Sequence, residues 1–363
     1  MQLTRNGPGR GVNRILQRGL SLLLWAEGDY SRSWQPCARL AADLVKRKFR
    51  IDAVIGEHGP DAGLHLAKWF SRRYQVPWVV DFRDPILMPF SGIARYLYLI
   101  LARHWLVSAS ATVTVTPGWA QLDRTLFNRP SFVIRNGFDP DDILGPTPAR
   151  AAGPLRIVYT GQVWRPFQRL EIFLSGLGLL RSMCKSLREV IKFTYVGPHD
   201  KLVSRLAAEA GVESAVEISG RVSRPEALQL QRSSDIALVV GLTKDPSLDW
   251  SMTGFLPGKV YEYLGAGLPI LCAPSDHADL HSMLERAEGV TFADTPEDVA
   301  RALRQFVFTA SKSPSGGLPK IKRDVRPFTR RESARQLSVL LDAVVRRRDL
   351  EAMASIRGAL GNG

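Results

Sequence analysis

Apolar residues in the first third of the chain alternate between short runs typical of buried strands and longer runs with helical spacing. Short runs rich in valine, isoleucine and aromatic residues predict four strands, at residues 51–56, 77–82, 111–116 and 131–134. Helical spacing predicts helices between them, near 61–74, 91–108 and 118–127. This strand–helix–strand order predicts a parallel sheet flanked by helices.

Residues 136–154 interrupt the alternation, because they lack apolar periodicity and are rich in glycine, proline, aspartate and alanine. Such a composition is typical of a linker. Six more strands are predicted after it, at 155–161, 191–197, 215–220, 235–241, 268–273 and 289–293. A last helix is predicted near 330–347.

The pattern therefore predicts an α/β protein with two Rossmann-like doubly wound domains. We place the first domain at residues 1–137, the linker at 138–154, the second domain at 155–330, and a C-terminal helix and tail at 331–363.

The N-terminal segment combines a basic start with the short apolar run GLSLLLWA. A signal peptide would need a small residue where Leu24 stands, so helical spacing between Ile15 and Leu24 favours an amphipathic helix. No other stretch has 18 uninterrupted apolar residues, and we predict no membrane-spanning segment.

Composition is that of an ordinary globular protein, with 363 residues, 45% hydrophobic and 23% charged. The three cysteines are odd in number and share no metal-ligand spacing, which favours a reducing, cytoplasmic location and argues against a zinc site. A net charge of +14 predicts an anionic partner, for which a nucleotide, a nucleic acid and an anionic membrane surface are the candidates.

Glycines follow several predicted strands of the second domain, in the loops at 159–165, 195–200, 219–224 and 241–259. Parallel sheets bind ligands at the carboxyl ends of their strands, so these loops predict a site for a phosphate-bearing ligand.

The stretch PGKVYEYLGAGLPIL predicts a short helix from about residue 258 to 264, with proline at its start and glycines at its end. Lys259 and Glu262 would share one face of this helix, while Val260 and Leu264 point to the core. A binding role for the charged pair competes with a structural role as an exposed ion pair.

Together with YTG, TYVGPHD and ISGRVSRPEALQLQRSSDIALVV, this stretch resembles the donor half of retaining glycosyltransferases of family four, which have the two-domain GT-B architecture. Residues 51–85 and FVIRNGFDPDD resemble the acceptor domain and interdomain link of the same family. The resemblance spans most of residues 34–345. It implies transfer of a sugar, with retention, from a nucleotide-diphosphate sugar to a hydroxyl acceptor on a cell-envelope polysaccharide, a lipopolysaccharide or a lipid-linked glycan.

In the family, the glutamate matching Glu262 accepts hydrogen bonds from the nucleotide ribose, and Lys259 and Gly258 would lie beside the diphosphate. The donor site implied by the resemblance consists of Gly161, Gln162, Arg165, Arg169, Gly197, Gly220, Arg221, Val222, Gly258, Lys259 and Glu262.

The sequence departs from the family at three of its usual site positions. Gly254 stands near the place of a second glutamate, and Gln162 and Phe167 replace an arginine and a lysine that neutralise the leaving diphosphate. Arg165 and Arg169 are the nearby substitutes.

The segment DFRDP supplies the candidate catalytic residues Asp81, Arg83 and Asp84, which would orient the acceptor hydroxyl or the transferred sugar. A structural ion pair between Arg83 and Asp84 is an equally weighted alternative. His58 is a further candidate for contact with the donor, against the alternative of a solvated loop histidine. The resemblance implies that a donor phosphate oxygen acts as the base, and that neither a metal nor a further cofactor is required.

The family's acceptor domain normally opens with roughly 100 residues before the stretch at which this chain starts. We therefore expect an incomplete first domain, or translation from upstream of Met1, and an exposed sheet edge. A catalytically impaired homologue and a nucleotide-sugar epimerase of the same architecture are the alternative functions.

Basic runs at 44–50, 319–331 and 344–349 are usually solvated faces. Without alternating aromatic residues they do not predict nucleic-acid binding. Peripheral attachment to the inner face of the membrane is favoured, supported by the nearby aromatic residues Trp34, Phe49, Trp69 and Phe70.

Overall fold

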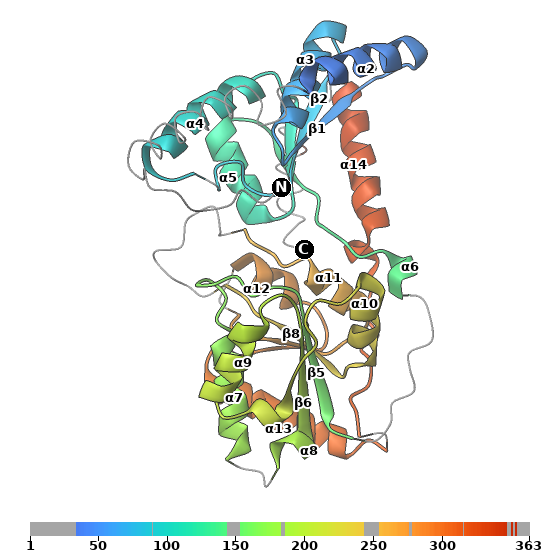
Figure 1. Ribbon diagram of the computed structural model, residues 1–363. Coiled ribbons are helices and arrows are strands. Elements are labelled where there is room, and N and C mark those ends of the chain that lie inside the picture. Colours follow the sequence, from blue (N-terminus) through green and yellow to red (C-terminus); the bar gives the residue numbers. More distant parts are fainter. Residues whose placement is uncertain are drawn as a thin grey trace. The chain divides into compact units, whose positions relative to one another are not determined.

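The computed structural model describes residues 34–88, 90–143, 153–182, 186–242, 254–275, 278–314 and 316–346, with residues 350 and 353 (Figure 1). The chain divides into two compact units: unit 1 contains the described residues up to Ile134 and from Leu337, and unit 2 is Arg135–Gln336. The predicted helix over residues 15–24 and much of the loop at 241–259 lie outside the described residues.

Unit 1 contains a parallel sheet of four strands in the order β1-β2-β3-β4. The strands are β1 (Val54–His58), β2 (Trp78–Phe82), β3 (Ala111–Thr114) and β4 (Ser131–Val133). The helices are α2 (Gln35–Lys48), α3 (Ala62–Tyr74), α4 (Gly92–Leu106) and α5 (Pro117–Phe127). The four strands and three helices predicted for this part of the chain are all present, with ends shifted by a few residues.

Both faces of the unit 1 sheet are covered by helices, which explains the continuous apolar runs of its strands. On one face, Leu340 and Val344 of α14 (Arg330–Val345) pack in a cluster with Val79 and Val113. On the other, the Phe82 ring lies 5.6 Å from that of Phe127 in α5. Among the described residues β1 forms one edge of this sheet, and its Ile55 side chain is exposed.

Unit 2 contains a parallel sheet of six strands in the order β10-β9-β8-β5-β6-β7. The chain runs outward from β5 through β6 and β7, and then returns to place β8 on the other side of β5. The strands are β5 (Leu155–Thr160), β6 (Ile191–Val196), β7 (Val216–Ile218), β8 (Ile236–Val239), β9 (Ile270–Cys272) and β10 (Val290–Phe292). This order reverses between β5 and β8, and a doubly wound sheet binds its ligand at such a reversal.

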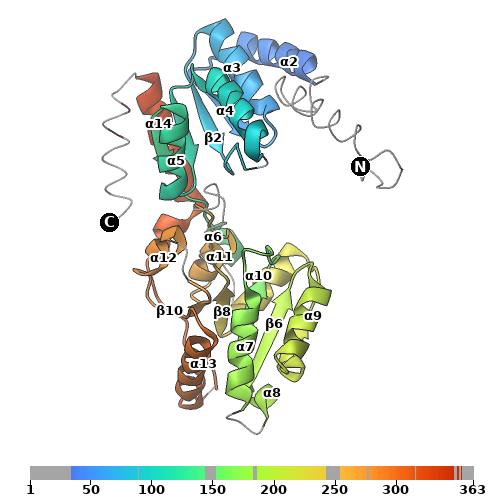
Figure 2. The same cartoon turned by 90° about the vertical axis from the view of Figure 1, so that its left-hand side faces the viewer.

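Helices lie on both sides of the unit 2 sheet, which is seen nearly edge-on in Figure 1, and Figure 2 shows β10, β8 and β6 across its width. Along β8, Ile236 and Leu238 join the core formed with α7 (Leu170–Arg181), α9 (Asp200–Glu209) and α13 (Pro296–Ser311). The alternate residues Ala237 and Val239 join the core formed with α11 (Lys259–Gly265) and α12 (Ala278–Leu284). The remaining helices are α6 (Pro140–Ile143), α8 (Leu187–Val190), α10 (Arg224–Ser233) and the 3₁₀ turns η2 (Glu213–Ala215) and η4 (Arg326–Phe328).

The prediction of an α/β protein with two Rossmann-like domains is confirmed. The segment expected to act as the linker contains α6, and Phe138 at its start packs into the second core of unit 2.

Candidate functional site

A cavity of about 320 Å³ opens at the carboxyl ends of β5 and β6 in unit 2. Its lining residues are Thr160, Gly161, Gln162, Val196, Gly197, Pro198, Arg221, Val222 and Ala227. Five of the predicted donor-site residues are among them: Gly161, Gln162, Gly197, Arg221 and Val222. The cavity lies beside the reversal of strand order, where a doubly wound sheet is expected to bind its ligand.

Glycine is required at two positions of this cavity. Gly161 has a φ of +114°, a conformation that side chains disfavour, and its N–H donates to the Val196 carbonyl at 2.7 Å. A Cβ at Gly197 would lie 2.3 Å from the Gly161 carbonyl oxygen, so no side chain fits there. The Gly197 N–H in turn donates to the Gly220 carbonyl at 2.9 Å. Three predicted glycines are thus linked through their backbones.

Lys259, the first residue of α11, brings a cation to the same edge of the sheet. Its Nζ lies 3.6 Å from the centroid of the Tyr159 ring, and a Cβ at Gly161 would lie 3.0 Å from Nζ. Burial lowers the pKa of Lys259 to about 7, against the opposing effect of the Glu262 charge. In the described parts of the chain no carboxylate forms an ion pair with Lys259, so its charge is available to an anionic ligand.

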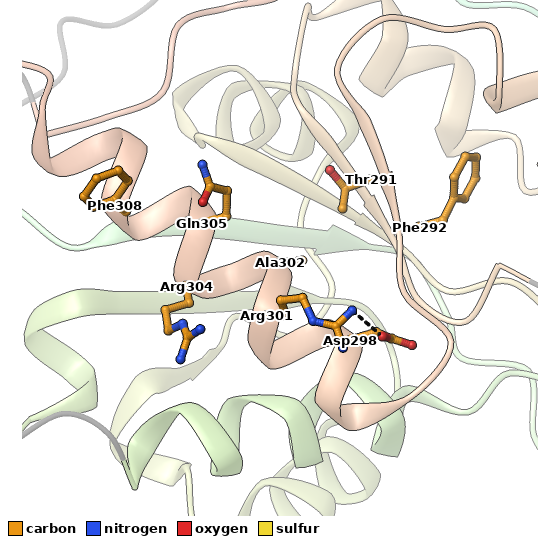
Figure 3. Close-up of a pocket in the computed structure, with 8 residues that line it drawn as sticks. All are labelled: Thr291, Phe292, Asp298, Arg301, Ala302, Arg304, Gln305 and Phe308. Carbon is orange, nitrogen blue, oxygen red and sulfur yellow. Dashed lines mark ion pairs between the residues drawn. The ribbon is translucent and has the colours of Figure 1, made fainter.

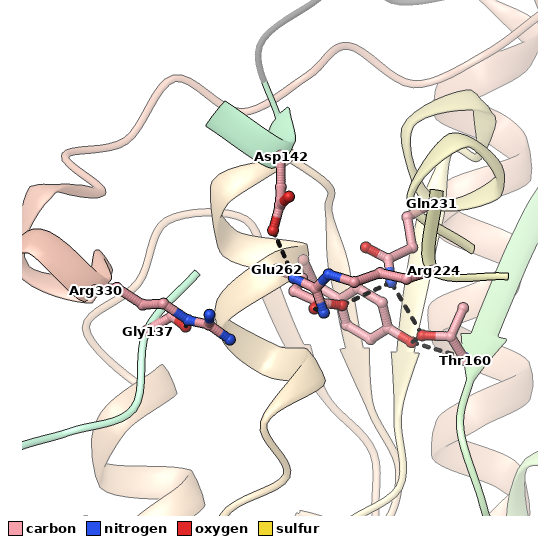
Figure 4. A network of polar contacts seen from close by, with 8 residues as sticks. Gly137, Asp142, Thr160, Arg224, Gln231, Glu262 and Arg330 are labelled. Carbon is pink, nitrogen blue, oxygen red and sulfur yellow. Dashed lines mark hydrogen bonds and ion pairs between the residues drawn. The ribbon is translucent and has the colours of Figure 1, made fainter. Parts of the chain in front are cut away.

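Glu262 is held by two donors from α10 rather than by Lys259 (Figure 4). Its Oε1 lies 3.0 Å from Nη1 of Arg224, and its Oε2 accepts a hydrogen bond of 3.0 Å from Nε2 of Gln231. The exposed Lys259–Glu262 ion pair considered as a structural alternative is therefore wrong. The carboxylate is four-fifths buried and fixed in orientation.

The same donors connect Glu262 to its surroundings on two sides. Arg224 Nη2 also donates to Oδ2 of Asp142 at 2.6 Å, which links α10 to α6. Gln231 Nε2 also donates to Oγ1 of Thr160 at 3.1 Å, at the end of β5. The Thr160 N–H donates to the hydroxyl of the buried Tyr263 at 2.9 Å. This network ties Glu262 to the edge of the cavity.

Sequence reasoning placed the loop at 219–224 at the site, but it did not identify Arg224 or Gln231 as partners of Glu262. The available signal was the capping box at Ser223 and Glu226, which starts α10 and which the structure shows with both of its hydrogen bonds. A helix starting there places Arg224 and Gln231 seven residues apart, on one face.

The predicted substitutes for the missing cations lie outside the lining of the cavity. Arg165 donates to both carboxylate oxygens of Glu171 at 2.7 Å, and Arg169 lies 3.6 Å from the same carboxylate. Gly258 is exposed and directly precedes Lys259, but does not line the cavity either. Their predicted donor contacts remain predictions.

The DFRDP segment follows β2 in unit 1, with Asp81 opposite Glu57 of β1 in the strand register. Burial and the Glu57 charge raise the pKa of Asp81, and Arg83 opposes them. Arg83 lies 3.7 Å from Glu57, and both side chains are exposed. The ion pair of Arg83 is therefore with Glu57 and not with Asp84, which corrects the structural alternative. Asp84 is exposed.

His58 is the buried last residue of β1, so the alternative of a solvated loop histidine is wrong. Its Nδ1 lies 2.5 Å from Oδ1 of the buried Asp61, and the Tyr98 hydroxyl donates to the other oxygen of that carboxylate. The ring is thus fixed at the carboxyl end of the sheet. Any contact between His58 and the donor remains a prediction.

The aromatic residues expected to support membrane attachment differ in exposure. Trp34 and Phe49 are exposed, whereas Phe70 is buried in unit 1 and cannot contact a membrane surface. No helix in the described parts of the chain is long and apolar enough to cross a bilayer.

A second cavity, of about 530 Å³, lies between β10 and α13 (Figure 3). Its lining residues are Thr291, Phe292, Asp298, Arg301, Ala302, Arg304, Gln305 and Phe308. It is larger than the first cavity, but it contains no predicted site residue and lies at the edge strand β10, away from the strand reversal. We therefore place the functional site at the smaller cavity.

Comparisons with known proteins bear on this site. Residues 177–312, within unit 2, match a family described as glycosyl transferase-like. A search of curated proteins finds no match. The fold is similar to a glycosyltransferase from Rickettsia africae ESF-5, with a TM-score of 0.57 and 13% identity over 94% of this chain and 84% of that one.

Two further structures of similar fold contain bound nucleotide. Anabaena Alr3699/HepE in complex with UDP has a TM-score of 0.57 and 14% identity over 85% of this chain and 82% of its own. The pneumococcal O-GlcNAc transferase GtfA in complex with UDP and GlcNAc has a TM-score of 0.52 and 11% identity over 84% and 60%.

At such identities the structural similarity shows the fold alone. That fold is the GT-B architecture expected from the sequence, and the family match falls on the unit that holds the cavity. The chain has the GT-B fold, and its fold and its match to the glycosyl transferase-like family together support a glycosyltransferase.

Proposed function

We propose that this protein transfers a sugar from a nucleotide-diphosphate sugar to a hydroxyl acceptor. The observation that carries the proposal is the fixed carboxylate of Glu262, held through Gln231 and Thr160 at the edge of a glycine-lined cavity. The carboxylate can accept hydrogen bonds from a diol, and the glycines let a phosphate group come close to the backbone. The two features together suit a ligand that has both groups.

Glu262 retains the capacity to bind a ribose. Each carboxylate oxygen receives one described donor, from Arg224 or from Gln231, whereas a carboxylate has roughly four acceptor positions. A vicinal diol can therefore donate to both oxygens without displacing either donor. In this proposal Arg224 and Gln231 orient Glu262 and do not compete with the nucleotide.

The diphosphate would lie beside Gly161 and Lys259. Gly161 lets a phosphate approach the backbone, and the Lys259 ammonium next to it favours the negative charge that grows on the leaving group. Arg221 in the cavity lining adds a second cation. Because two structures of similar fold contain UDP, UDP is the first nucleotide to test.

In unit 1, Asp81, Arg83, Asp84 and His58 remain the candidates for orienting the acceptor or the transferred sugar. We propose retention of configuration, with a donor phosphate oxygen as the base and with no metal or further cofactor. The proposed acceptor is a cell-envelope polysaccharide, a lipopolysaccharide or a lipid-linked glycan, glycosylated on the cytoplasmic side of the membrane.

The test is a thermal-shift panel with UDP, GDP, ADP and dTDP on the whole chain. At a concentration about 100-fold above Kd, the correct nucleotide adds about 2.7 kcal/mol, a melting shift of several degrees. Glu262→Ala should abolish the shift. Glu209→Ala, which removes the carboxylate of an exposed pair with Arg205 in the same unit, should retain it.

Absence of a shift with every nucleotide would contradict the proposal. A shift without transfer to any acceptor would instead identify the chain as an impaired homologue that keeps its donor site. With an active preparation, the anomeric configuration of the product, read by NMR, decides between retention and inversion.

A further inference from the structure

Helix α4 of unit 1 presents four large apolar side chains to solvent. Ile93 is 79% exposed, Tyr96 63%, Leu97 44% and Ile100 48%. Their spacing of three, four and seven residues places them on one side of the helix. We call these four residues the α4 stripe.

The opposite side of α4 is apolar as well, because Tyr98, Ala102, Trp105 and Leu106 are buried in unit 1. A helix that is apolar on both sides is normally enclosed by protein or in contact with lipid. The sequence of α4 contains no aspartate or glutamate. A solvated helix face would usually carry such residues.

Exposed apolar residues are concentrated in unit 1. Of the fifteen large hydrophobic residues that are exposed in the described parts of the chain, twelve belong to unit 1. The three in unit 2, Trp164, Leu179 and Phe308, lie on separate elements. Single exposed apolar residues are ordinary, but a row of four on one helix marks an interaction surface.

Cations gather near the C-terminal end of the stripe. Lys68 of α3 donates through Nζ to the His104 carbonyl of α4 at 3.0 Å, and burial together with the charge of the neighbouring Arg72 lowers the pKa of Lys68. Arg103 of α4 is exposed as well. An apolar row that ends in cations is complementary to a bilayer surface, where acyl chains lie beneath anionic headgroups.

We propose that the α4 stripe docks unit 1 on the surface of an anionic lipid bilayer. Ile93, Leu97 and Ile100 enter the acyl boundary, Tyr96 lies at the headgroup level, and the cations contact anionic headgroups. This inference rests on the proposed function for its meaning, since docking would bring the transferase to a lipid-linked acceptor. Docking on a bilayer can be tested without any nucleotide.

The test is sedimentation of the whole chain with two kinds of vesicle, one of phosphatidylcholine and one containing phosphatidylglycerol as well. The test variant is Ile93→Glu with Ile100→Glu. The matched control is Leu179→Glu with Phe308→Glu, which makes the same charge change at exposed apolar positions of unit 2. Wild type and control should bind the anionic vesicles, and the test variant at least roughly tenfold less.

The dependence of vesicle binding on salt concentration distinguishes its electrostatic part from its apolar part. High salt should weaken the binding of wild type without abolishing it, because salt screens charges but does not weaken apolar insertion. Melting temperatures report the folding of each variant, and all four positions are exposed, so only small changes are expected. The nucleotide thermal shift, measured without lipid, should be the same in all three proteins, so failure of docking is distinguishable from failure of the donor site.

Three results would overturn the proposal. One is that wild type binds neither kind of vesicle. Another is that the α4 variant binds as well as wild type, which would place the lipid contact elsewhere. The third is that light scattering shows a dimer that the α4 variant dissociates, while no vesicle is bound, which would make the stripe an interface between copies.

Discussion

The Glu262 carboxylate lies 3.0 Å from the Arg224 guanidinium, although Lys259 precedes it by one helical turn in the same helix. Arg224 bridges Glu262 and Asp142, and so links α11 to α6 through α10. Glu262 is oriented by residues distant in sequence, and the Lys259 ammonium is left available beside Gly161. The two charged groups of α11 thus do not pair with each other, and in the proposed function they bind different parts of the ligand.

Arg224→Ala should weaken nucleotide binding by about three- to tenfold, because Glu262 loses one of its two described donors while Gln231 still holds the other oxygen. Stability should change by less than about 1 kcal/mol, since Arg224 is half exposed. Calorimetric titration with the nucleotide measures the effect. Arg205→Ala, which breaks an exposed pair in α9, is the control, and equal affinities in the two variants would remove Arg224 from the site.

Nucleotide affinity should decrease as the pH rises above 7. The pKa of Lys259 is about 7 in the free protein, and a bound diphosphate would raise it by favouring the charged form. Nucleotide affinity is therefore highest below the pKa that Lys259 has in the free protein. It decreases as the pH rises toward the higher pKa that Lys259 would have in the complex. Titrations from pH 7 to about pH 9, where the ligand phosphates are already ionised, should show proton uptake. Lys259→Met should bind weakly with no such slope. A slope that persists in that variant would assign the proton to another group.

Lys259→Met should raise the melting temperature of the free protein. Burial lowers the pKa of Lys259 from 10.5 to about 7, so the folded state disfavours the proton that the unfolded chain keeps. The gain should be largest at and below pH 7 and shrink as pH rises toward 10.5. Lys201→Met, at an exposed position of α9, should show little gain at any pH. A lower melting temperature for Lys259→Met at pH 7 would mean that contact with the Tyr159 ring outweighs the cost of burial.

Asp61→Ala should destabilise the protein by about 2 to 4 kcal/mol, because it removes the buried partner of both His58 and Tyr98. Asp84→Ala removes an exposed carboxylate and should stay within about 0.5 kcal/mol of wild type. Urea unfolding followed by circular dichroism compares them. Similar stabilities of the two variants would show that the buried contacts contribute little.

Asp81→Asn should reduce sugar transfer strongly while leaving the nucleotide thermal shift intact, if Asp81 orients the acceptor as proposed. The rate of wild type should fall on the acid side at a pH above 3.8, because burial and Glu57 raise the pKa of Asp81. Glu57→Gln should move that acid limb to lower pH by removing a like charge. Unchanged transfer by Asp81→Asn would exclude Asp81 from catalysis.

Local signals in the sequence predicted α11 closely. Proline before the helix and glycines after it placed it at 258–264, and the structure has it at Lys259–Gly265. The side-chain partners of Glu262 were not predictable in this way, because Arg224 and Gln231 reach it from another helix, α10. Neighbours in sequence suggested Lys259 instead.

The burial of His58 shows the same limit. The sequence placed it just after a strand, whereas it is the last residue of β1, and its enclosure depends on Tyr98, forty residues later in α4. The glycines of the cavity were identified because strand ends in a parallel sheet meet at one edge, a rule that needs only the order of the strands. Features set by local sequence or by topology were thus predictable, and side-chain partners across helices were not.

The division of the chain has a consequence for its synthesis. Leu340 and Val344 cover the sheet face that includes Val79 and Val113, but the ribosome makes roughly 200 residues of unit 2 between β4 and Leu337, which takes on the order of 10 to 40 s. Unit 2 can fold during this interval, whereas the apolar face of unit 1 stays open until the C-terminal helix emerges. Unit 1 is therefore synthesised first but completes its core last. Until then its open apolar face is the surface through which newly made chains would aggregate.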